Sequence, residues 1–191
     1  MNGLIEKDQQ LLLFLNSLGN SAFDPFWLTV TGKWFWIPFY AILLYLLYKA
    51  FPLKKLLFVL IFITIGITIS DQLAGIFKHG IQRYRPCHTE ALISQMRMVI
   101  CGGNYGFYSS HASNSFFLFS FLTILIGKKY KFLPYILFVW AAIVSYSRIY
   151  LGVHFPLDIA FGAAVGFLLG GVLANLAQKV VFKKDNPDST F

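Results

Sequence analysis

The sequence predicts an all-α fold, a polytopic transmembrane bundle of about five helices preceded by a helix in the membrane interface. Composition and apolar segment length both point to this class. Hydrophobic residues make up 57% of the chain and charged residues only 13%, whereas soluble domains carry about 25% charged residues. With a mean hydropathy of +0.64, the chain lacks the polar surface that a water-soluble globule needs. We expect residues 1–191 to form a single membrane-embedded domain.

The first element is an amphipathic segment, residues 1–22, that does not read as a secretory signal. Its longest apolar run is only five residues, Leu11 to Leu15, and it has neither a basic start nor a small-residue cleavage site. We therefore expect an interfacial helix that stays in the mature protein. The alternative is a shortened or re-entrant first span.

Five apolar segments are long enough to cross about 30 Å of hydrocarbon at about 1.5 Å per residue. They are residues 34–48, with a start as early as 26 left open, then 56–77, 112–126, 133–150 and 155–176. Gly162, Gly166 and Gly170 recur at every fourth position of the last segment, a spacing that lets helices pack closely. A polar tail, residues 185–191, ends the chain.

Basic residues predict the orientation in a cell (inner, cytoplasmic) membrane. Cationic segments follow the first, third and fifth spans and face the cytoplasm by the positive-inside rule: Lys49, Lys54, Lys55, Lys128, Lys129, Lys131, Lys179, Lys183 and Lys184. The loop 78–111 and the turn around Gly152 then face outward. Some cations stand on that outer side against the charge bias, and binding an anion would explain them: Lys78, Arg83, Arg85, Arg97 and Arg148.

The formal net charge of +8 has a membrane explanation. Cationic loops orient spans and meet anionic lipids, so we expect the phospholipid bilayer as a partner. No basic helix or basic patch with interleaved aromatics indicates a nucleic-acid partner.

Cys87 and Cys101 both lie in the long outer loop, where an oxidising compartment allows them to pair. Two free buried thiols are the alternative. With only two cysteines, a cysteine-based metal site is not expected.

The first polar cluster, residues 78–86, follows the second span. Lys78 and Arg85 are seven residues apart, so they share a face if the helix continues that far. A lysine supplies a mobile point charge, and an arginine supplies a planar fork that suits phosphate. Snorkelling cations at a helix end are the alternative.

The second cluster, residues 105–115, precedes the third span. Ser109 and Ser110 stand where the backbone N–H groups of a helix N-terminus lack internal partners and attract anions. His111 is placed to give or take a proton near neutral pH. A plain serine cap beside a solvated histidine is the alternative.

The third cluster joins the fourth and fifth spans. His154 and Asp158 are four residues apart, so they are neighbours where a helix begins, and Arg148 precedes them. A carboxylate beside an imidazole fixes its tautomer and raises its basicity, which makes His154 a candidate nucleophile. A structural His–Asp pair is the alternative. For Asp71, inside the second span, we favour a packing hydrogen bond over a catalytic role.

All three clusters reach the same membrane face under this topology. Neither paired carboxylates nor an HExxH motif is present to hold a catalytic metal, so we expect no metal and no other cofactor. Cations would take the place of a metal in stabilising phosphoryl charge.

The pattern K-x6-R-P, S-x-H and S-R-x5-H-x3-D resembles the phosphatidic acid phosphatase type 2 superfamily, which includes lipid phosphate phosphatases and vanadium haloperoxidases. The resemblance covers residues 56–176 and is carried by Lys78, Arg85, Pro86, Ser109, His111, Ser147, Arg148, His154 and Asp158. It implies a metal-free phosphatase in which His154 attacks phosphorus, Asp158 orients it and His111 protonates the leaving oxygen. The residues implied to hold the phosphate are Lys78, Arg85, Arg148, Ser109 and Ser110.

Two features depart from the family pattern. Tyr108 and Ser110 stand where the family usually has Pro and Gly, and a serine is strained if the turn needs a positive φ. The family also often has six spans, whereas this sequence predicts about five.

The sequence thus predicts a membrane lipid phosphatase that cuts a phosphomonoester or diphosphate at the outer face. Candidate substrates are a polyprenyl diphosphate, a lipid A phosphate, phosphatidylglycerophosphate and phosphatidic acid, with the first two favoured. A non-catalytic anionic-lipid binder or transporter, and a vanadate-dependent haloperoxidase, are the alternatives. The oligomeric state is left open.

Overall fold

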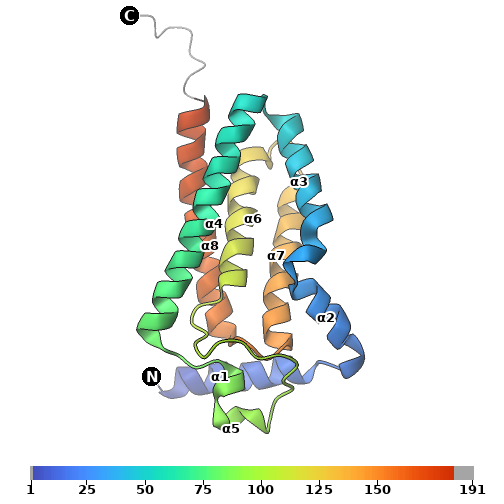
Figure 1. The fold of residues 1–191 in the computed structure, drawn as a ribbon, viewed down its shortest axis with the longest axis vertical. Helices are drawn as coiled ribbons and strands as arrows, with labels where there is room; N and C mark the ends of the chain where they lie inside the picture. The colour runs from blue at the N-terminus through green and yellow to red at the C-terminus, as the bar shows by residue number, and fades with distance from the viewer. Residues whose placement is uncertain (1, 183–191) are drawn as a thin grey trace, which may run out of the picture.

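The computed structural model describes residues 2–182, so the polar tail 185–191, Lys183 and Lys184 lie outside the described residues. The described residues form helices joined by turns and loops, with one isolated bridge between Tyr84 and Tyr105. Its helices are α1 (Asn2–Ser17), α2 (Asp24–Thr31), α3 (Ile37–Ala50), α4 (Leu53–Ile81), α5 (Glu90–Ile93), α6 (Ser110–Ile126), α7 (Leu133–Tyr150) and α8 (Pro156–Phe182) (Figure 1). Short 3-10 turns, η1 (Ser21–Phe23), η2 (Lys33–Trp36) and η3 (Pro86–His88), connect them. The all-α prediction is confirmed.

Three described helices, α4, α7 and α8, are long and apolar enough to cross a membrane. They correspond to the second, fourth and fifth predicted spans. The first predicted span is a broken one, because α2 and α3 meet at a bend of 64°. Gly32, with extended backbone (φ −77°, ψ 131°), ends α2 there. The third predicted span is α6, an apolar helix of 17 residues.

Helix α6 lies at the centre of the bundle, against α4, α7 and α8 (Figure 1). The three regularly spaced glycines of α8 face its backbone. A Cβ at Gly162 would lie 2.6 Å from the Ser109 carbonyl oxygen, and one at Gly170 would lie 2.5 Å from that of Phe117. The prediction that these glycines allow close packing is therefore confirmed. The seam also holds the start of α8 against the start of α6, where the Ser109 N–H donates to the Asp158 carbonyl at 3.1 Å.

Helix α1 lies across one end of the bundle, as expected of an interfacial helix (Figure 1). Leu12 is buried in a small cluster with Leu92, Ile149 and Phe155. Leu4 and Phe14 on α1, and Leu18 just after it, are more than half exposed, with exposed fractions of 61–62%. The lysine-rich loops lie at the opposite end, where Lys129 Nζ donates to the Lys49 carbonyl at 2.6 Å.

Cys87 and Cys101 form a disulfide, so the free-thiol alternative does not hold. The bond closes the irregular segment between α4 and α6 at the same end of the bundle as α1. Its Gly102 packs on the Arg85 guanidinium, where a Cβ would lie 3.3 Å from Arg85 Cζ. The disulfide therefore stands beside one of the predicted phosphate-binding side chains.

Candidate active site

Lys78 and Arg85 come from different backbone segments, which corrects the shared-face prediction. Helix α4 ends at Ile81, and Gln82 adopts a left-handed conformation (φ 53°) that turns the chain away. Arg85 lies in the extended segment beyond, where its N–H donates to the Asn104 carbonyl at 2.9 Å. The turn nevertheless directs both side chains to the same region. Lys78 Nζ donates to Ser110 Oγ at 2.9 Å, and Arg85 Nη1 lies 3.3 Å from His154 Nε2.

His154 and Asp158 form a buried pair in the turn between α7 and α8. Gly152, in the left-handed region (φ 81°), reverses the chain, and Pro156 begins α8. His154 Nδ1 and Asp158 Oδ2 are 3.4 Å apart, a long contact, and Asp158 Oδ2 accepts a shorter bond from the Phe155 N–H at 3.0 Å. The side chains are 2% and 0% exposed. Asp158 therefore orients both the imidazole and the backbone that carries it.

The surroundings of His154 favour its neutral form. Burial lowers the pKa of His154 well below its ordinary value, the positive charges of Arg85, Arg148 and Lys78 lower it further, and a hydrogen bond to the Gly106 backbone acts in the opposite direction. These three cations, which we call the cationic cradle, all act on one imidazole although they come from α4, α7 and the loop between α4 and α6. A neutral imidazole keeps its lone pair, which is the form a nucleophile needs.

Several polar atoms in and beside the cradle have no hydrogen-bond partner among the described residues. They include Ser109 Oγ, Arg85 Nε and Arg148 Nε, all buried. Arg148 Nη1 does bond to Thr31 Oγ1. Ser109 occupies the N-cap position of α6 but makes no side-chain capping bond, so the plain-cap alternative does not hold. Buried polar groups are nearly always satisfied in folded proteins, and an oxyanion would satisfy these.

Ser110 is the first residue of α6, and the only non-glycine residue with positive φ in the described chain is Gln82. The serine that replaces the family glycine therefore adopts an ordinary backbone conformation. It presents its hydroxyl to Lys78.

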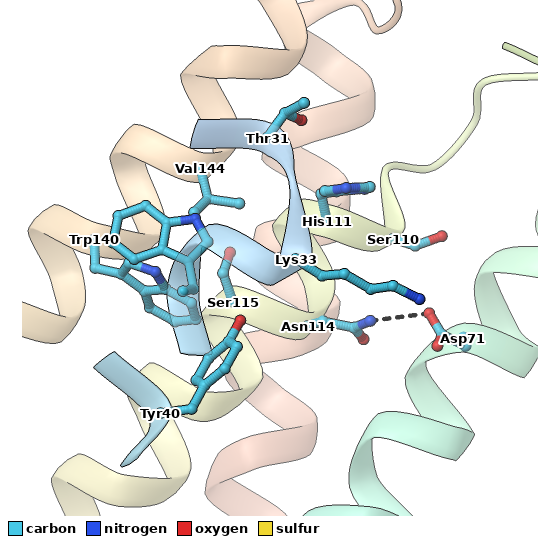
Figure 2. Close-up of a pocket in the computed structure, with 11 residues that line it drawn as sticks. Thr31, Lys33, Tyr40, Asp71, Ser110, His111, Asn114, Ser115, Trp140 and Val144 are labelled. Carbon is cyan, nitrogen blue, oxygen red and sulfur yellow. Dashed lines mark hydrogen bonds between the residues drawn. The ribbon is translucent and has the colours of Figure 1, made fainter. Parts of the chain in front are cut away.

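A cavity of about 290 Å³ is lined in part by His111, and we call it the His111 cavity (Figure 2). Figure 2 shows Asn114 of α6 donating to Asp71 of α4, at 2.9 Å, with Lys33 extending toward the same carboxylate. The predicted packing hydrogen bond of Asp71 is therefore present. The complete lining is Thr31, Lys33, Trp36, Tyr40, Asp71, Ser110, His111, Asn114, Ser115, Trp140 and Val144.

The His111 cavity and the cradle meet at α6. Of the predicted site residues, Ser110 and His111 line the cavity, while His154, Asp158, Ser109 and the cradle do not. A second, apolar groove of about 250 Å³ shares Tyr40 with the cavity and is otherwise lined by Leu43, Leu44, Leu47, Leu60, Ile63, Leu118 and Leu122. The His111 cavity, which lies beside the cradle, thus adjoins the apolar groove.

Sequence reasoning missed Asp8, Thr31 and Arg83 as parts of this site. Arg83 was recognised only as a cation on the outer side. Asp8 and Thr31 lie on α1 and α2, far from the three clusters in sequence, and no local spacing indicated them. Arg83 Nη1 donates to Asp158 Oδ1 at 2.8 Å.

Comparison with models of known protein families gives a match. The model of the PAP2 superfamily matches residues 53–182, a range that includes every predicted catalytic and phosphate-binding residue. The chain belongs to the PAP2 superfamily. The resemblance stated from the sequence motifs is therefore confirmed.

Individual PAP2 relatives agree with this assignment. The chain is 37% identical to a lipid A 4'-phosphatase of Bacteroides thetaiotaomicron, over 96% of this chain and 84% of the relative. It is 34% identical to a lipid A 4'-phosphatase of Porphyromonas gingivalis, over 89% of this chain and 72% of the relative. Its fold is similar to the crystal structure of a PAP2-type phosphatidylglycerolphosphate phosphatase from Bacillus subtilis, with a TM-score of 0.72 at 21% identity, covering 94% of this chain and 89% of the other. The chain is a multi-pass membrane phosphatase, and the non-catalytic binder alternative is set aside.

Proposed function

We propose that this chain hydrolyses the phosphate of a membrane lipid at the extracytoplasmic face, through a phosphohistidine on His154. One observation carries the proposal: the buried His154 faces the cationic cradle, with Nε2 3.3 Å from Arg85 Nη1. The two lipid A 4'-phosphatase relatives make a lipid A 4'-phosphate the first substrate to test.

In the first step the phosphate enters the cationic cradle. Lys78, Arg85, Arg148, the Ser109 hydroxyl and the N-terminal amides of α6 hold its oxygens. His154 Nε2 attacks phosphorus, so a P–N bond forms as the P–O bond to the lipid breaks. The leaving oxygen departs opposite His154 and takes a proton from the imidazolium form of His111, which the negative charge of the bound phosphate stabilises, giving the free lipid alcohol.

In the second step water replaces the lipid. His111, now neutral, removes a proton from a water molecule that attacks phosphorus in line with the P–N bond. That bond breaks, inorganic phosphate forms, and His154 returns to its neutral state with Asp158 still orienting Nδ1. Protons balance over the cycle, and no step requires an oxidant or a metal.

The His111 cavity is then the place of the leaving group. An in-line reaction puts the nucleophile and leaving oxygen on opposite sides of phosphorus. His111 lines this cavity and His154 does not. The lining of the His111 cavity combines aromatic and polar side chains, which suits a headgroup that has both apolar faces and hydroxyls. The aromatic ones are Trp36 and Trp140, and the polar ones include Asp71 and Asn114. The adjoining apolar groove is placed to receive a hydrocarbon chain.

Two features support an extracytoplasmic site. The lysine-rich loops lie at the end of the bundle opposite the cradle, as the positive-inside rule requires. The Cys87–Cys101 disulfide lies at the cradle end, and disulfides persist in oxidising compartments.

Phosphate release from purified protein tests the proposal. Wild-type protein in detergent would be given lipid A 4'-phosphate, phosphatidic acid, phosphatidylglycerophosphate and a polyprenyl diphosphate in parallel. We expect release from the lipid A substrate, with no loss on adding EDTA. The His154→Ala variant should lose about four orders of magnitude or more, as removal of a covalent nucleophile does in other hydrolases.

The intermediate gives a second readout. A phosphohistidine is labile in acid and stable in alkali, so quenching a reaction with labelled substrate in alkali should trap label on wild-type protein and none on His154→Ala. Turnover that survives His154→Ala would reject the mechanism. Halide oxidation in the presence of vanadate, with no phosphate release, would favour the haloperoxidase alternative.

A further inference from the structure

Asp158 makes a second charged contact that the proposed mechanism does not use. Its Oδ2 faces His154 and the Phe155 N–H, while Oδ1 accepts a hydrogen bond from Arg83 Nη1 at 2.8 Å. The Arg83 guanidinium also stacks on the Phe155 ring, 4.0 Å from its centroid. Arg83 therefore fixes one oxygen of the carboxylate and packs on the residue that follows His154.

Arg83 is itself held by the N-terminal helix. Its Nη2 donates to Asp8 Oδ2 of α1 at 2.6 Å, and the two side chains are 21% and 1% exposed. The other oxygen, Asp8 Oδ1, accepts a bond from the Leu157 N–H at 2.9 Å. Asp8 thus contacts both the guanidinium and the first turn of α8, on which Asp158 stands.

The geometry points to Asp8, acting through Arg83, as a positioning residue for the His154–Asp158 pair. Asp8 lies outside residues 53–182, the range matched by the family model. The inference rests on the proposed function, because it assigns these residues a role in orienting the nucleophile. A series of contacts, from Asp8 through Arg83 to Asp158 and His154, thus links the expected interfacial helix α1 to the catalytic pair.

Arg83 can act as a positioning residue because the contact between His154 and Asp158 is loose and needs a further restraint. The His154–Asp158 distance of 3.4 Å is long for a hydrogen bond, so that contact alone constrains the carboxylate weakly. Arg83 supplies a charge-assisted bond in a planar fork, which carries stronger directional restraint. A half-buried arginine held between two carboxylates has few other positions, so Asp8 limits the orientations of Asp158.

The structure offers a matched control in a second ion pair of the same kind. Arg97 Nη2 donates to both oxygens of Asp24, at 2.8 and 3.0 Å, and Tyr150 Oη donates to Asp24 as well. This pair also ties the N-terminal region to the rest of the bundle. Neither Asp24 nor Arg97 contacts His154 or Asp158 in the described hydrogen bonds, so its loss tests stability without the positioning role.

The experiment compares full-length Asp8→Asn, Arg83→Gln, the double variant and Asp24→Asn in detergent, on the panel substrate that the wild type hydrolyses fastest. We expect Arg83→Gln to lower kcat by about 10- to 100-fold, the usual range for a residue that orients a functional group. Asp8→Asn should lower kcat in the same sense, with KM within about twofold of wild type because phosphate contacts are kept. An asparagine at position 8 keeps an oxygen that can accept from the Leu157 N–H, so Asp8→Asn mainly removes the charged contact with Arg83. The double variant should therefore be no slower than Arg83→Gln.

Thermal unfolding of each variant separates this role from a general loss of stability. Asp24→Asn should lower the unfolding temperature and leave kcat unchanged. Equal kcat values for Asp8→Asn and Asp24→Asn, or additive losses in the double variant, would overturn the inference. Should Asp8→Asn fail to fold, Asp8→Glu and Arg83→Lys carry the same comparison, and wild-type kcat in both would overturn it. An inactive wild type would instead reject the proposed function.

Discussion

Ser109 has a hydroxyl that is buried and has no partner among the described residues. It stands at the N-cap of α6, yet its side chain makes no capping bond. A hydroxyl in that state contributes nothing to folding and carries the cost of its own desolvation. Its contribution should appear only when an anion is bound.

Ser109→Ala should therefore separate binding from stability. We expect an unfolding temperature equal to or slightly above that of wild type, together with a fall in kcat/KM of about tenfold or more, because a hydrogen bond to a charged group contributes about 1.5–3 kcal/mol. Initial rates on the chosen lipid phosphate and a thermal melt in detergent measure the two effects.

Ser145 provides the comparison for that variant. Its hydroxyl is also buried without a partner among the described residues, and it lies on α7 one turn before Arg148, where we propose no contact with the phosphate. Ser145→Ala should leave both the melt and kcat/KM unchanged. A loss of stability in Ser109→Ala with normal kinetics would show that the hydroxyl is a structural cap after all.

At the scale of residues, the sequence predicted those site contacts whose two partners lie close together along the chain. His154 and Asp158 stand four residues apart, and such a pair can be recognised from one helical turn. The links from Asp8 to Arg83 and from Thr31 to Arg148 span 75 and 117 residues. Only the packing of α1 and α2 against the rest of the bundle brings those residues together, and no periodicity encodes it.

At the scale of helices, the close packing of α8 on α6 determines the geometry of the site. Gly162, Gly166 and Gly170 leave room for the α6 backbone, and a Cβ at Gly166 would collide with the Ser113 carbonyl. Backbone cannot rotate away as a flexible side chain can. The seam therefore determines how closely the start of α8, with Asp158, approaches the start of α6, with Ser109.

Gly166→Ala should destabilise the protein by about 1–3 kcal/mol, the usual cost of overpacking. Part of the activity should be lost with it, because α8 must shift away from α6. Unfolding in detergent, followed by calorimetry or circular dichroism, measures the stability change.

Gly75→Ala on α4 is the matched control, since a Cβ there would meet nothing within 4 Å. An alanine inside a helix is favoured over glycine by about 0.5–1 kcal/mol, so this variant should be as stable as wild type or more so. A Gly166→Ala variant as stable as Gly75→Ala would contradict the packing described for the seam.

Helix existence was predictable from apolar length, but helix ends were not. The sequence left open whether the helix of span two continues to Arg85, and α4 ends at Ile81, where Gln82 takes a left-handed conformation without being a glycine. The break at Gly32 was not predicted either, although Gly32 and Lys33 interrupt the apolar run there. Neither end follows from apolar length alone, because a helix can continue through an isolated glycine or polar residue.

The whole molecule has two chemically distinct ends. Lysine-rich loops gather at one, and α1, the disulfide and the cationic cradle gather at the other (Figure 1). By the positive-inside rule, these loop charges support the outward-facing cradle that we propose.

Labelling of introduced cysteines tests that orientation. In cells, Gln95→Cys, near the disulfide end, should react with a membrane-impermeant maleimide, and Lys54→Cys, at the lysine-rich end, should react only after permeabilisation. Both positions are exposed, and the native cysteines are paired. The reverse labelling pattern would contradict the proposed orientation, and activity measured in the same cells shows that each variant is folded.

The shortness of α6 has a consequence for which molecules this protein can serve. Its 17 residues reach roughly 26 Å, less than the roughly 30 Å of hydrocarbon in a bilayer. If the end of α6 next to Lys128 lies at one membrane surface, the end that carries Ser109 and Ser110 would lie a few ångströms below the other. A lipid phosphate could reach that depth by lateral diffusion within its own leaflet. A sugar phosphate without an acyl chain would have to lose its hydration shell with no buried chain to compensate, so we expect such a site to favour lipid substrates over soluble ones.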